Sequence, residues 1–440
     1  MAQVVEREKP TSPQLAHYST EFQRASAESG TQPRWLQQAR ESAMTQFERL
    51  GFPTTRLEQW RFTSVAPIAE RTFSLARNGA GSADAALVAP LTSGGVAAVV
   101  VNGRFAPQSS SLKNVPKGVQ ISGLEQALAA DPGSIEPYLA KLTLTQSNAF
   151  TSLNTAFIRD GLVIFIAPHT VVETPIEIVL ASTGPDAVSH PRLLVVAGEG
   201  SQITLLERYV GEGAAFTNAV GEVWLGANAI IDHYKLQEQP ADSFHVASMF
   251  VHSARNGNFT SHSLTFGGSL VRNDIVAVLD GEGIDCTLNG LYVGRANQLI
   301  DNHTTIDHAM PHCSSHEVYK GIMADRSRGV FNGKIIVRPD AQKTDAKQTN
   351  KALLLSDDAN VNTKPELEIF ANDVKCTHGA AIGQLDEDAM FYLRSRGLSV
   401  AESRAMLIHA FAGDILNRIK IAAVRDHLAN TLTARLPHVD

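Results

Sequence analysis

Cysteine is scarce in this chain. Its 440 residues include three cysteines, Cys286, Cys313 and Cys376, at unrelated spacings. Disulfide frameworks and structural zinc sites use several cysteines at characteristic spacings, and an iron-sulfur cluster held by cysteine alone needs four thiolates. One copy of the chain therefore cannot build a four-cysteine cluster, and any cluster that it holds needs ligands from a partner.

The sequence also lacks a long hydrophobic run and an excess of basic charge. No stretch reaches the ~18–20 apolar residues of a membrane-spanning helix, and residues 1–10 alternate charge without the apolar core of a secretory signal. The formal net charge is −7, so neither nucleic acid nor an anionic membrane is expected as a partner. These absences predict a cytoplasmic protein.

Two motifs that suggest other chemistry are incomplete. Residues 329–335 resemble a phosphate-binding loop, but they have one residue too few between the glycines and no Ser or Thr after Lys334. We therefore expect no ATP binding by this chain. A run of possible metal ligands lacks the two spaced pairs of a zinc site, so hydrogen bonds in turns and walls are the preferred interpretation. Its members are Asp301, His303, Asp307, His308, His312, Cys313 and His316.

The first region, residues 1–95, is predicted to be helical after a polar lead that ends near residue 30. Apolar residues recur at three- and four-residue steps from Leu36 to Leu50, which is the spacing of one helix face. Pro33 suits the start of that helix, and Gly51 ends it.

The second region, residues 96–385, has the pattern of many short strands, with one helical insert predicted near residues 122–142. Ile284, Cys286 and Leu288 alternate with polar residues, which is typical of a strand with one apolar face. Glycines separate such runs at frequent intervals. This pattern fits both a β-sandwich and a β-solenoid, and no clean repeat distinguishes them.

The third region, residues 386–440, returns to helical spacing. Asp386 can cap a helix that ends at Gly397, and Ser399 with Glu402 has the capping-box spacing for a second helix. The apolar side of that second helix is predicted to begin at Met406.

Cys376 and His378 form the most specific candidate site. If the segment around them is a strand, the two side chains project from one face, while Lys375 and Thr377 face the other way. A thiolate and an imidazole can ligate iron or zinc, but they make only half of a four-ligand site.

Three segments resemble the SufB/SufD family of iron-sulfur cluster assembly scaffolds, most closely its SufD branch. They are residues 333–382, which include the Cys-Thr-His-Gly segment at 376–379, residues 388–399, and residues 51–63. The resemblance implies a mainly β fold: a right-handed parallel β-helix core flanked by N-terminal and C-terminal helical regions. The C-terminal helices would also cover one open end of the stack, where strand edges are otherwise unpaired.

The same resemblance implies a function. The chain would form a scaffold with a SufB-like paralogue and a SufC-like ABC-type ATPase, and ATP hydrolysis would belong to SufC, so the chain itself would be no enzyme. His378 and Cys376 would be candidate ligands of a transient iron-sulfur cluster shared with the SufB-like subunit. The C-terminal helical region would dock SufC through these candidate residues: Phe391, Leu393, Arg394, Arg396, Ser399 and Glu402. A monomer and a homodimer of the isolated chain both fit the sequence.

Carbohydrate-active lyases and hydrolases are the alternative class, because they also use the β-helix architecture. Such enzymes need clustered carboxylates on one outer face. Asp301, Asp307 and Asp325 are the scattered candidates here.

Overall fold

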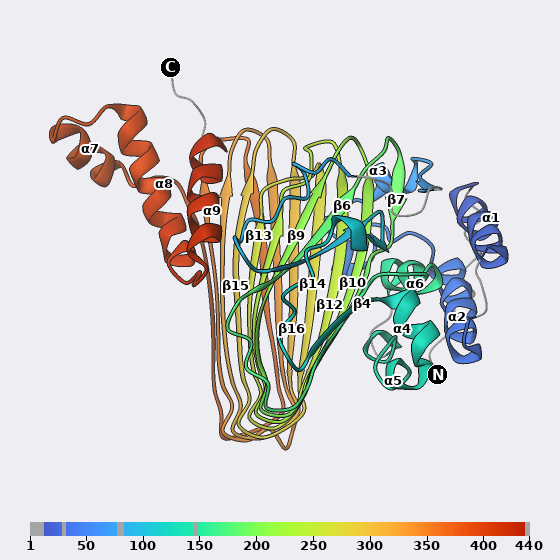
Figure 1. Cartoon of the computed structure of the whole chain (residues 1–440). Coiled ribbons are helices and arrows are strands. Elements are labelled where there is room, and N and C mark those ends of the chain that lie inside the picture. The colour runs from blue at the N-terminus through green and yellow to red at the C-terminus, as the bar shows by residue number, and fades with distance from the viewer. Residues whose placement is uncertain (1–12, 29–31, 77–82, 145–147, 436–440) are drawn as a thin grey trace, which may run out of the picture.

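The computed structural model describes residues 13–28, 32–76, 83–144 and 148–435. The protein is mainly β, with a β-solenoid core of about eight turns and helices toward both ends of the chain, as Figure 1 shows. This is the predicted fold class. In the described ranges no helix is long and apolar enough to cross a membrane.

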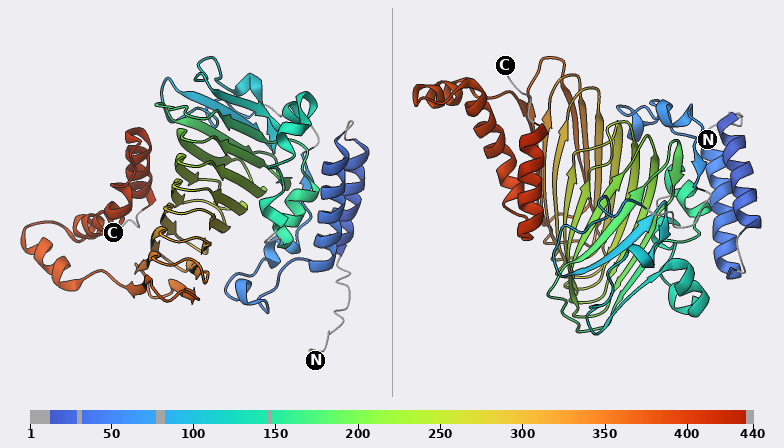
Figure 2. Two further views of the ribbon diagram at one scale, coloured as in Figure 1. Left: turned by 90° about the horizontal axis from the view of Figure 1, so that it is seen from below. Right: turned by 45° about the horizontal axis from the view of Figure 1, so that its top comes forward.

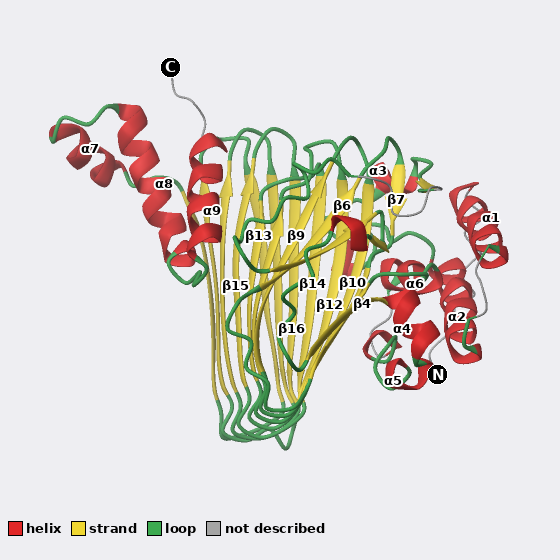
Figure 3. Ribbon diagram, viewed as in Figure 1, coloured by secondary structure: helices red, strands yellow, loops and turns green. Residues whose placement is uncertain are grey.

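Two long sheets form the walls of the solenoid, and each turn contributes one strand to each sheet (Figure 3). The first sheet contains β4 (Val119–Gly123), β5 (Leu162–Ile166), β8 (Arg192–Ala197), β10 (Phe216–Leu225), β12 (Phe244–Ser253), β14 (Leu270–Leu279), β16 (Leu299–His308), β18 (Arg328–Val337) and β20 (Asn360–Ile369), with β1 (Ser74–Leu75) and β7 (Ala187–Ser189) beside them. The second sheet contains β3 (Arg104–Phe105), β2 (Val96–Val101), β6 (Ile176–Ser182), β9 (Gln202–Gly211), β11 (Ile230–Gln237), β13 (Asn258–Thr265), β15 (Asp285–Gly294), β17 (Ser314–Met323), β19 (Asp345–Leu354) and β21 (Lys375–Gly383). Apart from the outermost strands β3 and β4, which pair antiparallel, successive strands of each wall pair in parallel, which makes the core a parallel β-helix.

The length of a turn varies along the solenoid. Phe216 pairs in register with Phe244, and Phe244 with Leu270, so one turn takes 28 residues and the next takes 26. Farther along, Arg328 pairs with Asn360, a turn of 32 residues. Corners of unequal length therefore hide the repeat in the sequence.

Inward side chains fill the lumen between the two sheets. Along the second sheet, Ile203, Ile231, Phe259 and Cys286 stack in register, and all four are buried. Each fully buried side chain of this size stabilises the fold by about 1.5–3 kcal/mol. The alternation read around Cys286 thus corresponds to one face in the lumen and one face outside.

The N-terminal region contains more helix than predicted. Helix α2 (Arg34–Leu50) lies where the apolar spacing placed one, but α1 (Pro13–Ala27) lies within the expected polar lead, a prediction that was wrong. Leu15 and Tyr18 of α1 are buried against Phe47 of α2 and Leu153 of α6 (Ala149–Ala156). Few apolar residues make up the buried side of α1, so its periodicity is weak in the sequence.

The insert near residues 122–142 contains the short helices α4 (Leu124–Ala130) and α5 (Pro132–Ile135). Another short helix, α3 (Ala66–Ala69), follows the motif at residues 51–63. Trp60 of that motif lies under the guanidinium group of Arg272 on β14, 3.8 Å from the ring centroid. The hydroxyl of Thr63 donates to Asp301 on β16 at 2.6 Å. The motif therefore ties the N-terminal region to the outer face of the first sheet.

The C-terminal region contains α7 (Glu387–Ser395), α8 (Val400–Leu416) and α9 (Ala422–Arg435). Asp386 caps α7, and Ser399 with Glu402 forms the predicted capping box of α8. Met406 does not begin the buried side of α8, because it is 49% exposed. Ser403 is the first buried residue of α8, and Ile408 is the first buried apolar one.

The expectation that these helices cover an open end of the stack was wrong. Ile415 of α8 and Leu428 of α9 pack on Leu236, Leu264 and Leu291, three outward residues that lie in register on the second sheet. Figure 2 shows α8 and α9 alongside the wall. Helices cover the wall because it carries an outward apolar stripe that would otherwise face water.

Buried histidines predict that acid destabilises the fold. Burial lowers the pKa of His190 to about 3 and the pKa values of His262 and His308 to about 4. The unfolded chain, with a histidine pKa near 6.5, then binds more protons than the folded chain, so this stability is complete above pH 6.5 and is lost as the pH falls toward 4. Burial raises the pKa of Glu317 to about 7, which acts in the opposite direction and offsets part of the effect.

We expect the free energy of unfolding in urea to fall by at least ~1 kcal/mol per pH unit between pH 6.5 and 5. The variant His190→Leu removes one of the three groups and should flatten this dependence. Equal stability at pH 6.5 and pH 5 would contradict the assignment of these histidines as neutral buried groups.

Candidate functional site

The β-helix ends in an open turn. Strands β20 and β21 stand last in the two sheet orders, so each has one edge without a neighbouring strand in the part of the chain that is described. Every residue of β21 except Cys376 is exposed. Backbone N–H and C=O groups on such an edge are a template for pairing with another chain.

Cys376 and His378 lie on one face of β21. In the register with β19, Cys376 lies opposite Ala346 and His378 opposite Gln348, and both of these partners are buried in the lumen. Thr377 lies opposite the exposed Lys347. The two candidate ligands therefore continue the inward face of the solenoid at its open end.

The two candidate ligand side chains differ in their surroundings. Cys376 is half-buried beside the small apolar cluster around Val337 and Ala346, and this burial raises the pKa of its thiol. His378 is exposed. No set of three His, Cys, Asp or Glu side chains that could hold a metal is found among the described residues, so the pair remains half of a site.

The candidate docking residues on α7 form an exposed surface. Phe391 is 76% exposed, and Tyr392, which the sequence did not single out, is 56% exposed. The guanidinium group of Arg396 lies 5.2 Å from the ring centroid of Tyr392, Arg394 is exposed and Leu393 is half-buried. Helix α7 has no buried residue, and in Figure 1 it projects away from the β-helix.

Ser399 and Glu402 have a different role from the other candidates. The hydroxyl of Ser399 accepts from the backbone N–H of Glu402 at 3.2 Å, and the Glu402 carboxylate accepts from the backbone N–H of Ser399 at 2.8 Å. Hydrogen bonds to Ser399 lower the pKa of Glu402. These two residues cap the start of α8.

Several members of the run of possible ligands between residues 301 and 316 form hydrogen bonds or ion pairs. Asp301 pairs with Arg272 at 2.9 Å and with His303 at 3.0 Å, and His308 lies 2.9 Å from the hydroxyl of Ser315. These contacts agree with the interpretation of the run as part of the wall.

The carboxylates of the carbohydrate-active alternative do not converge either. Asp301 is buried, Asp307 holds the guanidinium group of Arg338 at 2.7 Å, and Asp325 accepts from the backbone N–H of Ala296 at 2.7 Å in a corner.

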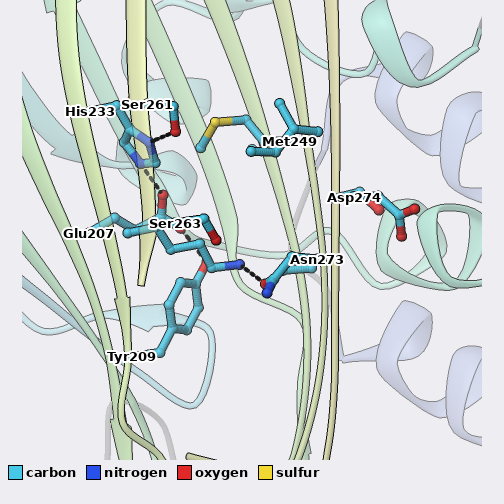
Figure 4. Close-up of a pocket in the computed structure, with 13 residues that line it drawn as sticks. Glu207, Tyr209, His233, Met249, Ser261, Ser263, Asn273 and Asp274 are labelled. Atoms are coloured by element: carbon cyan, nitrogen blue, oxygen red, sulfur yellow. Dashed lines mark hydrogen bonds and ion pairs between the residues drawn. The ribbon is translucent and has the colours of Figure 1, made fainter. Parts of the chain in front are cut away.

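A polar cluster that the sequence did not indicate lies inside the β-helix (Figure 4). Glu207 accepts hydrogen bonds from the Tyr209 hydroxyl and, at 2.8 Å, from Nε2 of His233. Nδ1 of His233 lies 3.0 Å from the hydroxyl of Ser261. The sequence feature that could have indicated this cluster is a charged residue at an inward position of a strand. Such a position can be recognised only once the register is known.

Lys235 completes this interior cluster. Its ammonium group donates to Asn273 at 2.7 Å, and burial lowers its pKa to about 8. The adjoining cavity has a volume of about 10 Å³, roughly the space of one water molecule. A cavity of this size holds no ligand larger than a water molecule. The polar groups of the cluster therefore hydrogen-bond to each other inside the solenoid.

The sequence matches two family profiles that together span most of the chain. The profile described as "SUF system FeS cluster assembly, SufBD core domain" covers residues 179–411, and "SufBD protein N-terminal region" covers residues 14–178. A SufBD family protein of Synechocystis, named for iron-sulfur cluster assembly, is 32% identical over 420 residues, which is 92% of each chain.

Among the relatives, two are named "Iron-sulfur cluster assembly protein SufD" and come from different bacteria. The one from Escherichia coli is 30% identical over 401 residues, with 90% of this chain and 92% of the relative covered. The one from Bacillus subtilis is 24% identical over 431 residues, with 94% and 97% covered.

The fold is a parallel β-helix with helical regions toward both ends of the chain, and two candidate ligands lie on its open terminal turn. The similarities over nearly the whole length identify the family. The chain belongs to the SufBD family of iron-sulfur cluster assembly proteins.

The three cysteines are expected to differ in reactivity. Cys286 and Cys313 are buried, and burial raises the pKa of both thiols, whereas Cys376 is only half-buried. Because the thiolate is the reactive form and needs access to reagent, iodoacetamide should label Cys376 first in the native chain. Mass spectrometry of tryptic peptides measures the three rates, and Cys376→Ser should remove the fast phase. Labelling of Cys286 or Cys313 at the rate of Cys376 would contradict the burial of those thiols.

Proposed function

We propose that this chain is the SufD-like subunit of a cytoplasmic scaffold that it forms with a SufB-like paralogue and a SufC-like ATPase. In this role His378 and, to a lesser degree, Cys376 ligate a nascent iron-sulfur cluster, which is the cargo of the scaffold. The observation that carries the proposal is the position of these two residues on β21, an exposed edge strand at the open end of the β-helix.

Strand pairing with a partner could supply the ligands that this chain lacks. Neighbouring strands of a sheet lie about 4.8 Å apart, so a strand of the partner that pairs with β21 brings its own side chains beside Cys376 and His378. The partner's ligands then complete the four that a cluster needs. The same pairing satisfies the open backbone groups of the edge.

His378 is the stronger of the two ligands in this proposal. Its imidazole is exposed on the strand, and a neutral imidazole ligates iron without first losing a proton. The thiol of Cys376 must be deprotonated, and burial raises its pKa.

Helix α7 is the proposed docking surface for the ATPase. An exposed helix that presents Phe391 and Tyr392 to water, with Arg394 and Arg396 beside them, has the composition of an interaction site. ATP hydrolysis takes place in the ATPase subunit, and no nucleic acid or membrane is needed for this role.

Replacement of His378 tests the ligand site. In a co-expressed complex of the three subunits, His378→Ala should leave the complex assembled and reduce its iron and acid-labile sulfide by about tenfold or more, because a ligand of the cluster is lost. Thr377→Ala, on the opposite face of the same strand, is the matched control and should keep the parental content. Parental iron and sulfide in His378→Ala would place the cluster elsewhere.

Replacement of Phe391 tests the docking surface. A charge at the centre of an apolar contact is costly, so Phe391→Asp should weaken binding of the SufC-like ATPase by about tenfold or more in calorimetry. Val171→Asp is the control, since Val171 is also a strongly exposed apolar residue, at 60%, but lies before β6 and far from α7 in the sequence, in an isolated bridge with Gln202. Unchanged affinity in Phe391→Asp, or an equal loss in Val171→Asp, would exclude α7 as the docking surface.

A further inference from the structure

Three polar side chains lie in register beneath the open end of the β-helix. Glu317 on β17 pairs with Gln348 on β19, and Gln348 pairs with His378 on β21. All three occupy inward positions of the second sheet, one turn after another. The candidate ligand His378 is therefore the outermost member of a column that runs into the lumen.

The inner two members of this column are tied together. Nε2 of Gln348 donates to Oε2 of Glu317 at 2.7 Å, and the two side chains are buried, with relative exposures of 2% and 1%. Either protonation state of the Glu317 carboxyl leaves Oε2 able to accept this bond. The contact turns the amide nitrogen of Gln348 toward Glu317, so the amide oxygen is left for another donor.

The opposite wall leaves space for this amide. Gly333 on β18 faces Gln348 across the lumen, and a Cβ added at Gly333 would collide with Nε2 of Gln348. The amide is thus confined between Glu317 on its own wall and the backbone of the facing wall.

The amide oxygen of Gln348 has no hydrogen-bond partner among the described residues, although it is buried. Leaving a buried acceptor unsatisfied is unfavourable, because the group has lost its hydrogen bonds to water. The next residue outward in the column is His378, whose imidazole carries an N–H.

We propose that Gln348 is a positioning residue for the cluster ligand: its Oε1 accepts a hydrogen bond from one ring nitrogen of His378, and Glu317 holds the amide in place. The bond turns the imidazole toward the lumen and leaves the other ring nitrogen with its lone pair outward, toward the nascent cluster. Histidines that ligate metals commonly donate their second ring N–H to an oxygen acceptor, which fixes the tautomer. This inference rests on the proposed function of His378.

The first experiment reads the imidazole itself in the full chain, without a cluster. The chain is labelled with ¹⁵N-histidine, and His378→Ala assigns the His378 signals. Gln348→Met removes the acceptor at nearly constant length, so the ratio of the two His378 tautomers should change severalfold. Exchange of the pair, Glu317→Gln with Gln348→Glu, again presents an acceptor oxygen and should restore the parental ratio. The same ratio in the parent and in Gln348→Met would overturn the inference.

The second experiment measures iron and acid-labile sulfide in the co-expressed complex. Gln348→Met should lower both toward the level of His378→Ala, and the exchanged pair should recover them. If His378→Ala lowers the content but Gln348→Met does not, the positioning role is wrong while the proposed function stands. If His378→Ala itself has no effect, the proposed function fails, and the tautomer ratio still decides whether Gln348 holds the imidazole.

A second variant covers the case in which Gln348→Met does not fold. Gly333→Ala keeps every polar group of the column but pushes the amide of Gln348 out of place, so it should change the tautomer ratio in the same direction. An unchanged ratio in a folded Gly333→Ala would likewise overturn the inference.

Discussion

Parallel strand pairing along the solenoid is the interaction on which the rest of the structure depends. Each turn satisfies the backbone groups of the turn before it, so the stack leaves unpaired edges only where it stops. At the N-terminal end the outermost strands, β3 and β4, are short and pair antiparallel with β2 and β5. At the C-terminal end the outermost strands are the long parallel strands β20 and β21, and the candidate ligands lie on β21.

The other surfaces of the β-helix are protected in different ways. Helices α8 and α9 cover the apolar stripe of the second sheet, and Trp60 with its neighbours covers part of the first. Inside, apolar stacks are interrupted by polar groups that bond to each other, such as Glu207 with His233 and Lys235 with Asn273. The walls are covered, whereas the strand edge at the open end is free in the described part of the chain. This arrangement suits a protein that pairs this edge with a strand of a partner.

Some features could be predicted from the sequence because their causes are local. The capping box at Ser399 and the helix from Arg34 to Leu50 depend on residues a few positions apart, and the shared face of Cys376 and His378 follows from strand alternation. Their proposed role as ligands came from family resemblance, since a cysteine and a histidine two residues apart are not specific by themselves.

Other features depend on register, which the sequence does not display. Turns of 26 to 32 residues obscure the repeat. The alignment of Leu236 with Leu264, and therefore the surface on which α8 packs, could not be predicted from the sequence. The same holds for the column of Glu317, Gln348 and His378, whose members are about thirty residues apart and meet only in the folded stack. The exposure of Tyr392 likewise became clear only from the structure, in which α7 has no buried residue.

The central claim is that the open edge of β21 is the surface where the partner completes the cluster site. Hydrogen exchange of backbone amides, measured by mass spectrometry on the free chain and on its complex with the SufB-like subunit, tests it most directly. The account predicts that peptides spanning residues 375–383 exchange readily in the free chain and become strongly protected in the complex, while peptides from the middle of the solenoid do not change. Protection that appears elsewhere on the molecule, with residues 375–383 exchanging as in the free chain, would contradict it.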